Sequence, residues 1–293
     1  MSTPKIAGAP ISWGVCEVPG WGHQLSAERV LREMSIAGLT ATELGPKGYL
    51  PTEPARLTSL LSSHGLKCAG TFAPVVLHDA ARDPVEDIVG RLDVLNACGA
   101  EVLVLAAATG TGGYDSRPTL DDAHWNAIFT NLDRLADAAA RRGLLVVLHP
   151  HVGTMVETPD DLERVLTGSA VRLCLDTGHL LIGGTDPVEL VRAVPERIAH
   201  VHLKDVDQAL AARVTAGDLT YMQAVAQRMY TPLGQGDVDI AAIVTALREN
   251  GFDGWFVLEQ DTILDAEPVE GGPLDDVIAS LNHLQTVLAG IPA

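Results

Sequence analysis

Two histidines in the middle of the chain directly follow an apolar segment, and such a pair can bind a metal ion or transfer protons. The segment spans residues 144–148, and His149 and His151 come after it. A continuous apolar run with β-branched residues predicts a strand that is buried on both faces. Because side chains two residues apart on a strand share a face, both imidazoles are expected to point the same way. In an α/β barrel, this position lies at the mouth, where active sites are built.

Three further polar residues end apolar segments later in the chain, namely Asp176, His202 and Glu259. Asp176 follows His149 by 27 positions, His202 follows Asp176 by 26, and Glu259 follows His202 by 57. The first two intervals match one strand–helix unit. Two imidazoles and two carboxylates at one rim suit Mn²⁺, Co²⁺, Fe²⁺ or Zn²⁺ better than Ca²⁺. A single Asp or His at a strand end is more commonly a hydrogen-bonded structural group, but four at matching positions favour a metal site.

Eight apolar segments that can position these groups alternate with helical segments. They lie at residues 6–12, 40–44, 67–72, 101–107, 144–148, 171–175, 198–203 and 255–259. Apolar rather than alternating strands indicate a parallel sheet covered by helices. Eight strand–helix units in about 290 residues predict a TIM (β/α)8 barrel, an α/β fold that forms a single domain over residues 1–293. An insertion at residues 206–237, with a helix expected at 218–229, separates strand 7 from helix 7 at 240–250.

An open, doubly wound sheet is the alternative arrangement of these elements. The first strand–helix turn has no G-x-G-x-x-G, and the chain has no P-loop, so neither nucleotide-binding signature supports it. The glycine-rich loop at residues 109–113 lacks a following Lys-Ser/Thr and is interpreted as a flexible rim or lid. The barrel is therefore the preferred fold.

Composition limits the partners and the compartment. The net charge of −18 disfavours nucleic acid, although a local basic patch stays open. No apolar run reaches 18 residues and no basic, apolar leader is found, which predicts a soluble, non-exported protein without a membrane partner. The four cysteines are widely spaced without C-x-x-C, so we expect free thiols in a reducing, cytoplasmic compartment.

At the predicted strand ends, the chain resembles the xylose-isomerase-like TIM barrels, the sugar isomerase/epimerase group that also contains endonuclease IV. The motifs that carry this resemblance are His200-Val201-His202-Leu203-Lys204-Asp205, Asp176-Thr177-Gly178-His179 and Leu258-Glu259-Gln260-Asp261. Three others are most similar to the myo-inosose-2 dehydratases within that family, namely Pro10-Ile11-Ser12-Trp13-Gly14, His149-Pro150-His151-Val152-Gly153-Thr154 and Pro232-Leu233-Gly234-Gln235-Gly236-Asp237-Val238-Asp239. The resemblance spans nearly the whole chain.

The resemblance implies a set of metal ligands. The family holds its metal with a strand-five Glu, a strand-six Asp, a strand-seven His and a strand-eight Glu. The last three map onto Asp176, His202 and Glu259, whereas His149 stands in place of the strand-five Glu, as in the dehydratase-like members. The epimerases are implied to use two metal-bound glutamates as paired acid/bases on opposite faces of the substrate. A neutral imidazole removes that symmetry, so elimination becomes more plausible than epimerisation.

The implied activity is dehydration of 2-keto-myo-inositol, or a related cyclic polyol ketone, in inositol catabolism. A divalent metal, Mn²⁺ or Co²⁺ above Zn²⁺ or Fe²⁺, would bind the ketone and stabilise an enolate while an acid protonates the departing hydroxyl. We assign Glu259 as ligand and base, and His151 or Lys204 as acid or oxyanion partner. Glu43 is a substrate-hydroxyl contact or a second acid/base. The alternatives are that Lys204 pairs with a neighbouring carboxylate and that Glu43 caps a loop.

Other residues near these strand ends have weaker assignments. His179 is a substrate contact or a partner that orients Asp176, and His200 is interpreted as a core histidine. Trp13 and Trp21 could stack on the apolar face of a substrate ring, although aromatic residues in a Pro/Gly loop are more commonly packing anchors. Trp13 is retained as a substrate-binding candidate.

Two other functions remain open. A ketose or inosose isomerase or epimerase would use the same site, and a sugar-binding barrel with a vestigial site would be non-catalytic. Endonuclease activity is disfavoured by the charge of −18 and by too few candidate ligands for three metals. Self-association stays open. The resemblance also implies a glutathione response, for which no residue here provides a recognisable site.

Overall fold

The eight predicted strands form a closed parallel barrel in the computed structural model, which describes residues 3–269 and 271–291. The strands are β1 (Lys5–Gly8), β2 (Ala41–Glu43), β3 (Lys67–Val75), β4 (Val102–Ala107), β5 (Leu145–Leu148), β6 (Arg172–Asp176), β7 (Ile198–Leu203) and β10 (Trp255–Leu258). Around the barrel they follow the order β1-β10-β7-β6-β5-β4-β3-β2, and neighbouring strands pair in parallel. The predicted TIM barrel is confirmed.

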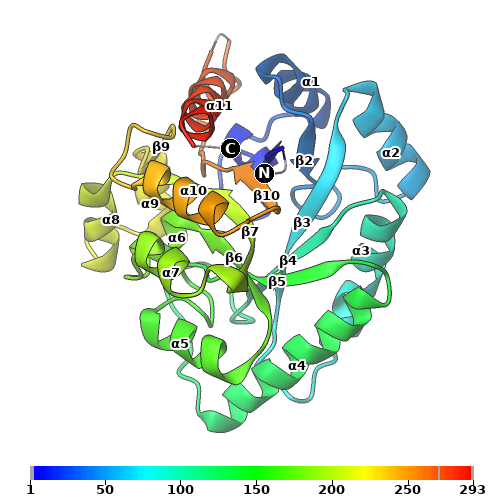
Figure 1. Ribbon diagram of the computed structural model, residues 1–293, viewed down its shortest axis with the longest axis vertical. Coiled ribbons are helices and arrows are strands. Elements are labelled where there is room, and N and C mark those ends of the chain that lie inside the picture. The colour runs from blue at the N-terminus through cyan, green and yellow to red at the C-terminus, as the bar shows by residue number, and fades with distance from the viewer. Residues whose placement is uncertain (1–2, 270, 292–293) are drawn as a thin grey trace.

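Helices surround the barrel (Figure 1). Among them are α1 (Ala27–Ala37), α2 (Pro54–Ser63), α3 (Pro84–Ala97), α4 (Asp122–Ala140), α5 (Pro159–Gly168), α7 (Pro187–Ala193), α10 (Ile240–Glu249) and α11 (Pro273–Ala289). The side chains of Asp83, Thr158 and Asp186 each accept a first-turn N–H, and each is followed by proline. Proline suits this position because its missing N–H would have no helical partner. Among the described residues, no helix has the length and apolar content of a membrane span.

The first strand is shorter than the sequence predicts. The strand expected at residues 6–12 ends at Gly8, and Pro10–Trp13 forms a 3-10 helix, η1. Pro10 has no N–H for a strand ladder and its ring fixes φ, so the strand cannot continue through it. The side chain of Trp13 is consequently fully buried.

The insertion after β7 contains two short helices and a two-stranded ribbon. The ribbon pairs β8 (Asp205–Val206) with β9 (Tyr230–Thr231), and α8 (Gln208–Thr215) and α9 (Tyr221–Ala226) lie between them. The helix expected at 218–229 is shorter because Thr220 caps its start and Arg228 adopts a φ of 62° beyond its end. The sequence predicted neither α8 nor the ribbon, and outside the insertion it did not predict α6 (Thr177–Ile182) or η2 (Pro195–Arg197).

The strand register brings predicted polar residues of neighbouring strands to the same end of the barrel. The strands β5, β6, β7 and β10 are consecutive around the barrel. Asp176 pairs with His202, and His202 pairs with Val257, two residues before Glu259. Side chains two residues apart share a face, so the carboxyl ends of these strands deliver their polar groups to the same rim.

Candidate metal centre

Four strand-end residues from four consecutive strands form one buried group of possible metal donors. Each of His149, Asp176, His202 and Glu259 offers one ligand atom, and these atoms all lie within 4.8 Å of one another. The two histidines and the aspartate are at most 1% exposed. Strand-end spacing predicted Asp176, His202 and Glu259 with the pair His149 and His151, the family resemblance singled out His149, and the structure brings these four residues together.

The distances show how closely the donors approach. His149 Nε2 donates to Asp176 Oδ2 at 3.2 Å, and His202 Nδ1 lies 2.8 Å from Glu259 Oε2 and 3.7 Å from Asp176 Oδ2. Despite these contacts, His202 Nδ1 is a buried atom without a hydrogen-bond partner among the described residues. A buried imidazole nitrogen normally has such a partner, and a cation between the carboxylates would satisfy it. The donor set therefore fits a divalent metal of the nitrogen/oxygen class.

Asp176 is oriented by the start of α6. Its Oδ1 accepts N–H groups from Gly178 and His179 at 2.9 and 2.8 Å, which leaves Oδ2 for the centre. Burial alone would raise the pKa of Asp176, but the Lys204 ammonium and the neighbouring imidazoles hold it well below its ordinary value. Asp176 is thus an ionised carboxylate with one oxygen fixed by the backbone and the other facing His149 and His202.

Lys204 neutralises the carboxylates of this centre. Its Nζ lies 3.1 Å from Asp176 Oδ2, 3.0 Å from Glu259 Oε2 and 2.9 Å from Asp261 Oδ1. Burial alone would lower the pKa of Lys204, but these three carboxylates raise it well above its ordinary value. Lys204 also lines the cavity. It therefore pairs with neighbouring carboxylates and, at the same time, can contact a molecule in the cavity.

Replacing Lys204 by methionine should lower the free energy of unfolding of the metal-free protein by about 3–5 kcal/mol, because buried carboxylates lose their shared cation. Urea unfolding measures this loss, and Mn²⁺ should restore part of it by supplying positive charge to the folded state. Lys5→Met is the matched control, since Lys5 pairs with Glu101 where the side chains are 39% and 50% exposed. That change should cost no more than about 1 kcal/mol. Equal losses in the two variants would contradict a buried charge cluster.

His151 lies at the cavity wall as a neutral imidazole. Burial lowers the pKa of His151 to about 3. Its Nδ1 donates to the Val152 carbonyl at 2.7 Å, because a carbonyl oxygen can only accept. Nε2 is therefore the unprotonated nitrogen, so His151 can accept a proton in the cavity but has none to give from Nε2. The role of acid that the sequence left open for His151 is disfavoured by this tautomer.

His179 supports the site from behind His151. The two rings stack with centroids 3.6 Å apart, and His179 Nε2 lies 3.1 Å from Lys204 Nζ. Within the described chain, the cavity is lined by His151 and Lys204, not by His179. The structure thus places His179 as a partner of these two side chains. Its ring has no surface in the cavity that could make the predicted contact with substrate.

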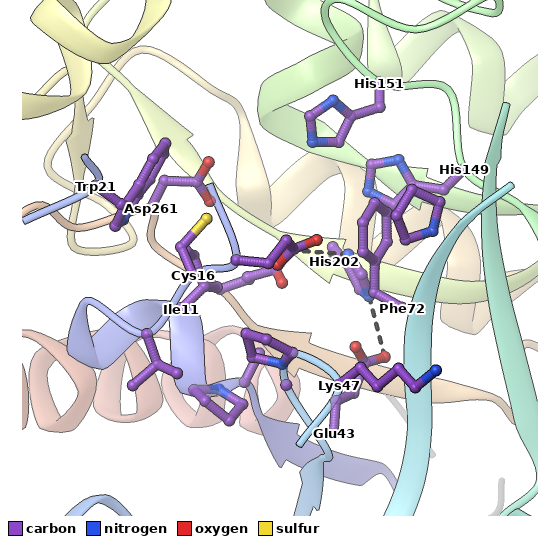
Figure 2. Close-up of a pocket in the computed structure, with 18 of the residues that line it drawn as sticks. Ile11, Cys16, Trp21, Glu43, Lys47, Phe72, His149, His151, His202 and Asp261 are labelled. Carbon is purple, nitrogen blue, oxygen red and sulfur yellow. Dashed lines mark hydrogen bonds and ion pairs between the residues drawn. The ribbon is translucent and has the colours of Figure 1, made fainter. Parts of the chain in front are cut away.

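The cavity extends from the metal centre toward the first loop (Figure 2). Trp21 and Glu43 line it, together with apolar side chains such as Ile11 and Phe72. Trp13 is not among the described lining residues, and its Nε1 donates to Glu33 Oε2 at 2.8 Å. The structure therefore uses Trp13 to anchor η1 on α1, whereas Trp21 has the position from which an aromatic face can contact a substrate ring.

Several site residues were missed by the sequence interpretation. Asp261 lines the cavity and accepts a hydrogen bond from the Tyr221 hydroxyl at 2.6 Å. Tyr221 in turn contacts the Tyr230 hydroxyl at 2.9 Å. Asp261 could have been found because it lies two residues after Glu259, but both tyrosines come from the insertion, whose position over the barrel no local pattern indicates.

Tyr114 closes the wall above His151, and Gly153 lets it do so. Tyr114 lines the cavity with its ring centroid 5.1 Å from that of His151. Gly153 has a φ of 73°, and a Cβ there would overlap the Tyr114 backbone. The neighbouring Asp115 accepts the backbone N–H of Tyr221 at 3.0 Å. The glycine-rich loop predicted as a rim is thus seated against the loop after β5.

Gly153→Ala is expected to displace this loop, whereas Gly143→Ala is not. Gly143 has a φ of 71°, and a Cβ there meets no described atom within 4 Å. The Gly143→Ala variant therefore measures the effect of backbone strain alone. That strain costs about 1–2 kcal/mol. Gly153→Ala should lower the stability measured by thermal unfolding more than Gly143→Ala does. It should also make residues 108–120 accessible to limited proteolysis. Equal protease resistance of the two variants would exclude the seating role of Gly153.

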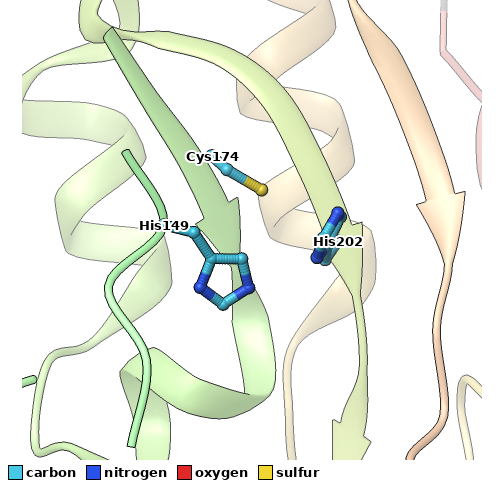
Figure 3. A group of neighbouring side chains, drawn as sticks. All are labelled: His149, Cys174 and His202. Atoms are coloured by element: carbon cyan, nitrogen blue, oxygen red, sulfur yellow. The ribbon is translucent and has the colours of Figure 1, made fainter. Parts of the chain in front are cut away.

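A buried thiol lies one layer below the metal centre. Cys174 is two residues before Asp176, and Figure 3 shows its sulfur beside the rings of His149 and His202. One donor atom from each of these three residues lies within 4.8 Å of the others. Burial raises the pKa of Cys174 to about 11. The thiol is therefore protonated in the metal-free protein. It lies deeper in the barrel than the nitrogen and oxygen donors.

Comparisons with known proteins agree with the barrel fold. A family model described as the xylose isomerase-like TIM barrel matches residues 31–285. The inosose dehydratase of Lacticaseibacillus casei is 30% identical over 297 residues, which cover 98% of each chain. The rhizopine catabolism protein MocC of Rhizobium meliloti is 35% identical over 289 residues, which cover 95% of this chain and 86% of MocC.

Solved structures share the fold at lower identity. The IolI protein, solved with a bound zinc atom, aligns with a TM-score of 0.72 at 17% identity and covers 99% of both chains. An L-ribulose 3-epimerase aligns with a TM-score of 0.72 at 19% identity, over 98% of this chain and 95% of its own.

Proposed function

Because the chain belongs to the xylose isomerase-like TIM barrel family and is an enzyme, we propose that it is a metal-dependent lyase that dehydrates 2-keto-myo-inositol or a close relative. The full-length similarity to inosose dehydratases supports this reaction class. The observation that carries the proposal is that the residue at the end of β5, next to Asp176, is His149 and not a carboxylate. A second carboxylate at this position would suit proton exchange on two faces of a substrate, as in an epimerase.

We assign the metal to His149, Asp176, His202 and Glu259, with Mn²⁺ or Co²⁺ as the preferred ions. When bound there, a divalent cation would polarise the substrate ketone and acidify the neighbouring C–H bond. The orphaned Nδ1 of His202 and the ionised Asp176 support this assignment. The IolI protein, which shares this fold and was solved with a bound zinc atom, supports a divalent ion here.

Two residues can take up the proton from the carbon next to the ketone. Burial alone would raise the pKa of Glu259, but His202 and Lys204 lower it to about 2, so it is a carboxylate at neutral pH. His151 offers the unprotonated Nε2 at the cavity wall. Our first choice for the base is Glu259, which lies beside the metal donors, with His151 as the alternative.

Lys204 is the preferred proton donor to the departing hydroxyl. Its ammonium group lies 3.0 Å from Glu259, and it is the cavity cation nearest to the metal donors within the described chain. Loss of water breaks one C–H and one C–O bond, so the base and the acid must serve different carbons. Lys204 starts as an ammonium and Glu259 as a carboxylate, so one group can donate a proton while the other accepts one.

The proposal is tested with purified protein that is stripped of metal and then loaded with Mn²⁺ or Co²⁺. Incubation with inosose should produce an ultraviolet-absorbing dione, and the rate should depend on the added metal. Turnover of inosose without a change in absorbance would overturn dehydration. Metal analysis of the loaded protein distinguishes an enzyme from a vestigial sugar-binding barrel, since a vestigial site would bind none of these ions.

An isomerase or epimerase acting on inososes or ketoses is the second candidate. It is favoured by one observation, namely that Glu259 and His151 both line the cavity as proton acceptors. Such an enzyme would exchange the substrate's α-hydrogen with deuterium from the solvent and would form no dione. Proton NMR in D₂O separates the two reactions in one experiment.

A cytoplasmic location is part of the same proposal. The four cysteines are free thiols in the described chain, and free thiols suit a reducing compartment. The four residues are Cys16, Cys68, Cys98 and Cys174.

A further inference from the structure

Glu43 connects two buried histidines across the interior of the barrel. It lies at the end of β2, whereas His200 and His202 lie on β7, which is not a neighbour of β2. Its Oε1 accepts hydrogen bonds from His200 Nε2 at 2.8 Å and from His202 Nε2 at 3.1 Å. Figure 2 shows the Glu43 carboxylate reaching His202. The side chain of Glu43 is only 3% exposed, so it has little contact with solvent.

We infer that Glu43 is a positioning residue for the metal centre, which holds His202 in the tautomer and the ring orientation that present Nδ1 to a cation. This inference rests on the proposed metal-dependent function. It differs from both roles that were expected for Glu43 from the sequence, a substrate-hydroxyl contact or a second acid/base.

The hydrogen bonds decide which nitrogen of His202 carries a hydrogen. A carboxylate can only accept, so both Nε2 atoms that contact Glu43 Oε1 must be donors. His202 therefore uses Nε2 for Glu43 and turns Nδ1 toward Glu259 and Asp176. Carboxylates that accept from the second nitrogen of a metal-bound histidine fix its ring, and their loss costs about 10–100-fold in metal affinity.

His200 makes the arrangement rigid. It is fully buried and its ring lies 5.3 Å from that of His202, nearly perpendicular to it. Because its Nε2 holds the same oxygen as His202, Glu43 cannot swing into the cavity without breaking two hydrogen bonds. His200, interpreted from the sequence as a core histidine, thereby has a definite partner.

The test compares Glu43→Ala and Glu43→Gln with wild type. Metal-free proteins are titrated with Mn²⁺ by calorimetry, and kinetics are then measured at saturating Mn²⁺. Glu43→Ala should weaken Mn²⁺ binding by about 10–100-fold. Glu43→Gln, which keeps an accepting oxygen, should lose less. At saturating Mn²⁺ the kcat should recover most of its value and the KM for inosose should stay within about twofold, since a positioning residue acts through the metal.

Glu33→Gln is the matched control, because Glu33 is also a buried glutamate but bonds Trp13 and Arg29 at η1 and α1. It should leave Mn²⁺ affinity unchanged. A raised KM with unchanged Mn²⁺ affinity in Glu43→Ala would overturn the inference and identify a substrate contact.

Nitrogen-15 NMR of histidine gives a second measurement that needs no substrate. Metal-loaded wild type should show His202 with its hydrogen on Nε2, and Glu43→Ala should lose that single tautomer. These readouts separate the inference from dehydration, because metal affinity and tautomer are defined even if inosose is not turned over. A wild-type protein that binds no Mn²⁺ would overturn both.

Discussion

Replacing Glu259 by alanine is expected to lower kcat/KM for inosose dehydration by on the order of 10³–10⁴-fold, because one carboxylate serves as both ligand and base. Glu259 Oε2 contacts His202 Nδ1 at 2.8 Å and Lys204 Nζ at 3.0 Å, so its loss disturbs the donor set and the proposed acid together. Metal affinity should fall as well, which calorimetric titration with Mn²⁺ measures independently of turnover.

The control for this change is Glu163→Ala, which removes an exposed glutamate from α5. It should leave kcat/KM and Mn²⁺ affinity unchanged within error. The assignment of Glu259 fails if Glu259→Ala keeps more than a tenth of wild-type activity at saturating Mn²⁺. Retained metal binding with lost turnover would keep Glu259 as the base and remove it from the ligands.

The positions of the metal-binding candidates could be predicted because each ends a buried strand. In a parallel barrel, the carboxyl ends of neighbouring strands meet at one rim. Polar residues at the carboxyl ends of apolar strands, as at β5 and β7, are therefore expected at this rim. Alternation on β7 also placed His200, His202 and Lys204 on one face, where the structure finds them in contact with Glu43 and Asp176.

The hydrogen-bond partners of these residues could not be predicted in the same way. Glu43 reaches His202 across the barrel interior, and the residues are 159 positions apart in the sequence. Tyr221 reaches Asp261 from α9 in the insertion. Such pairings depend on loop conformation and barrel closure, neither of which has a local sequence pattern. A strand end therefore predicts that a residue lies at the rim, but not which atoms it contacts.

The two tryptophans of the first loop illustrate the same limit. Trp13 and Trp21 occupy one Pro/Gly-rich segment, and both are buried. Only the 3-10 turn that begins at Pro10 decides that Trp13 faces Glu33, while Trp21 donates to the Thr262 carbonyl at 2.9 Å and lines the cavity. Proline explains the end of the strand, but the direction of the chain after it depends on packing against α1 and the loop after β10.

His149→Glu should suppress dehydration by at least about 10²-fold and favour proton exchange. The new carboxylate would lie where His149 Nε2 now faces Asp176 Oδ2 at 3.2 Å, and would give the metal centre a second ionised base. Two carboxylates beside one carbonyl can remove and return a proton without expelling a hydroxyl. Proton NMR in D₂O should therefore show deuterium entering the substrate while the ultraviolet signal of the dione falls.

His149→Gln distinguishes charge from the mere loss of an imidazole. A neutral amide cannot act as a base at neutral pH, so this variant should lose metal affinity and activity without gaining deuterium exchange. If His149→Glu still favours elimination over exchange, or if His149→Gln gains exchange to the same extent, the residue at the end of β5 does not decide the reaction. Preference for elimination would then depend on the acid, and Lys204 would become the residue that separates dehydration from isomerisation.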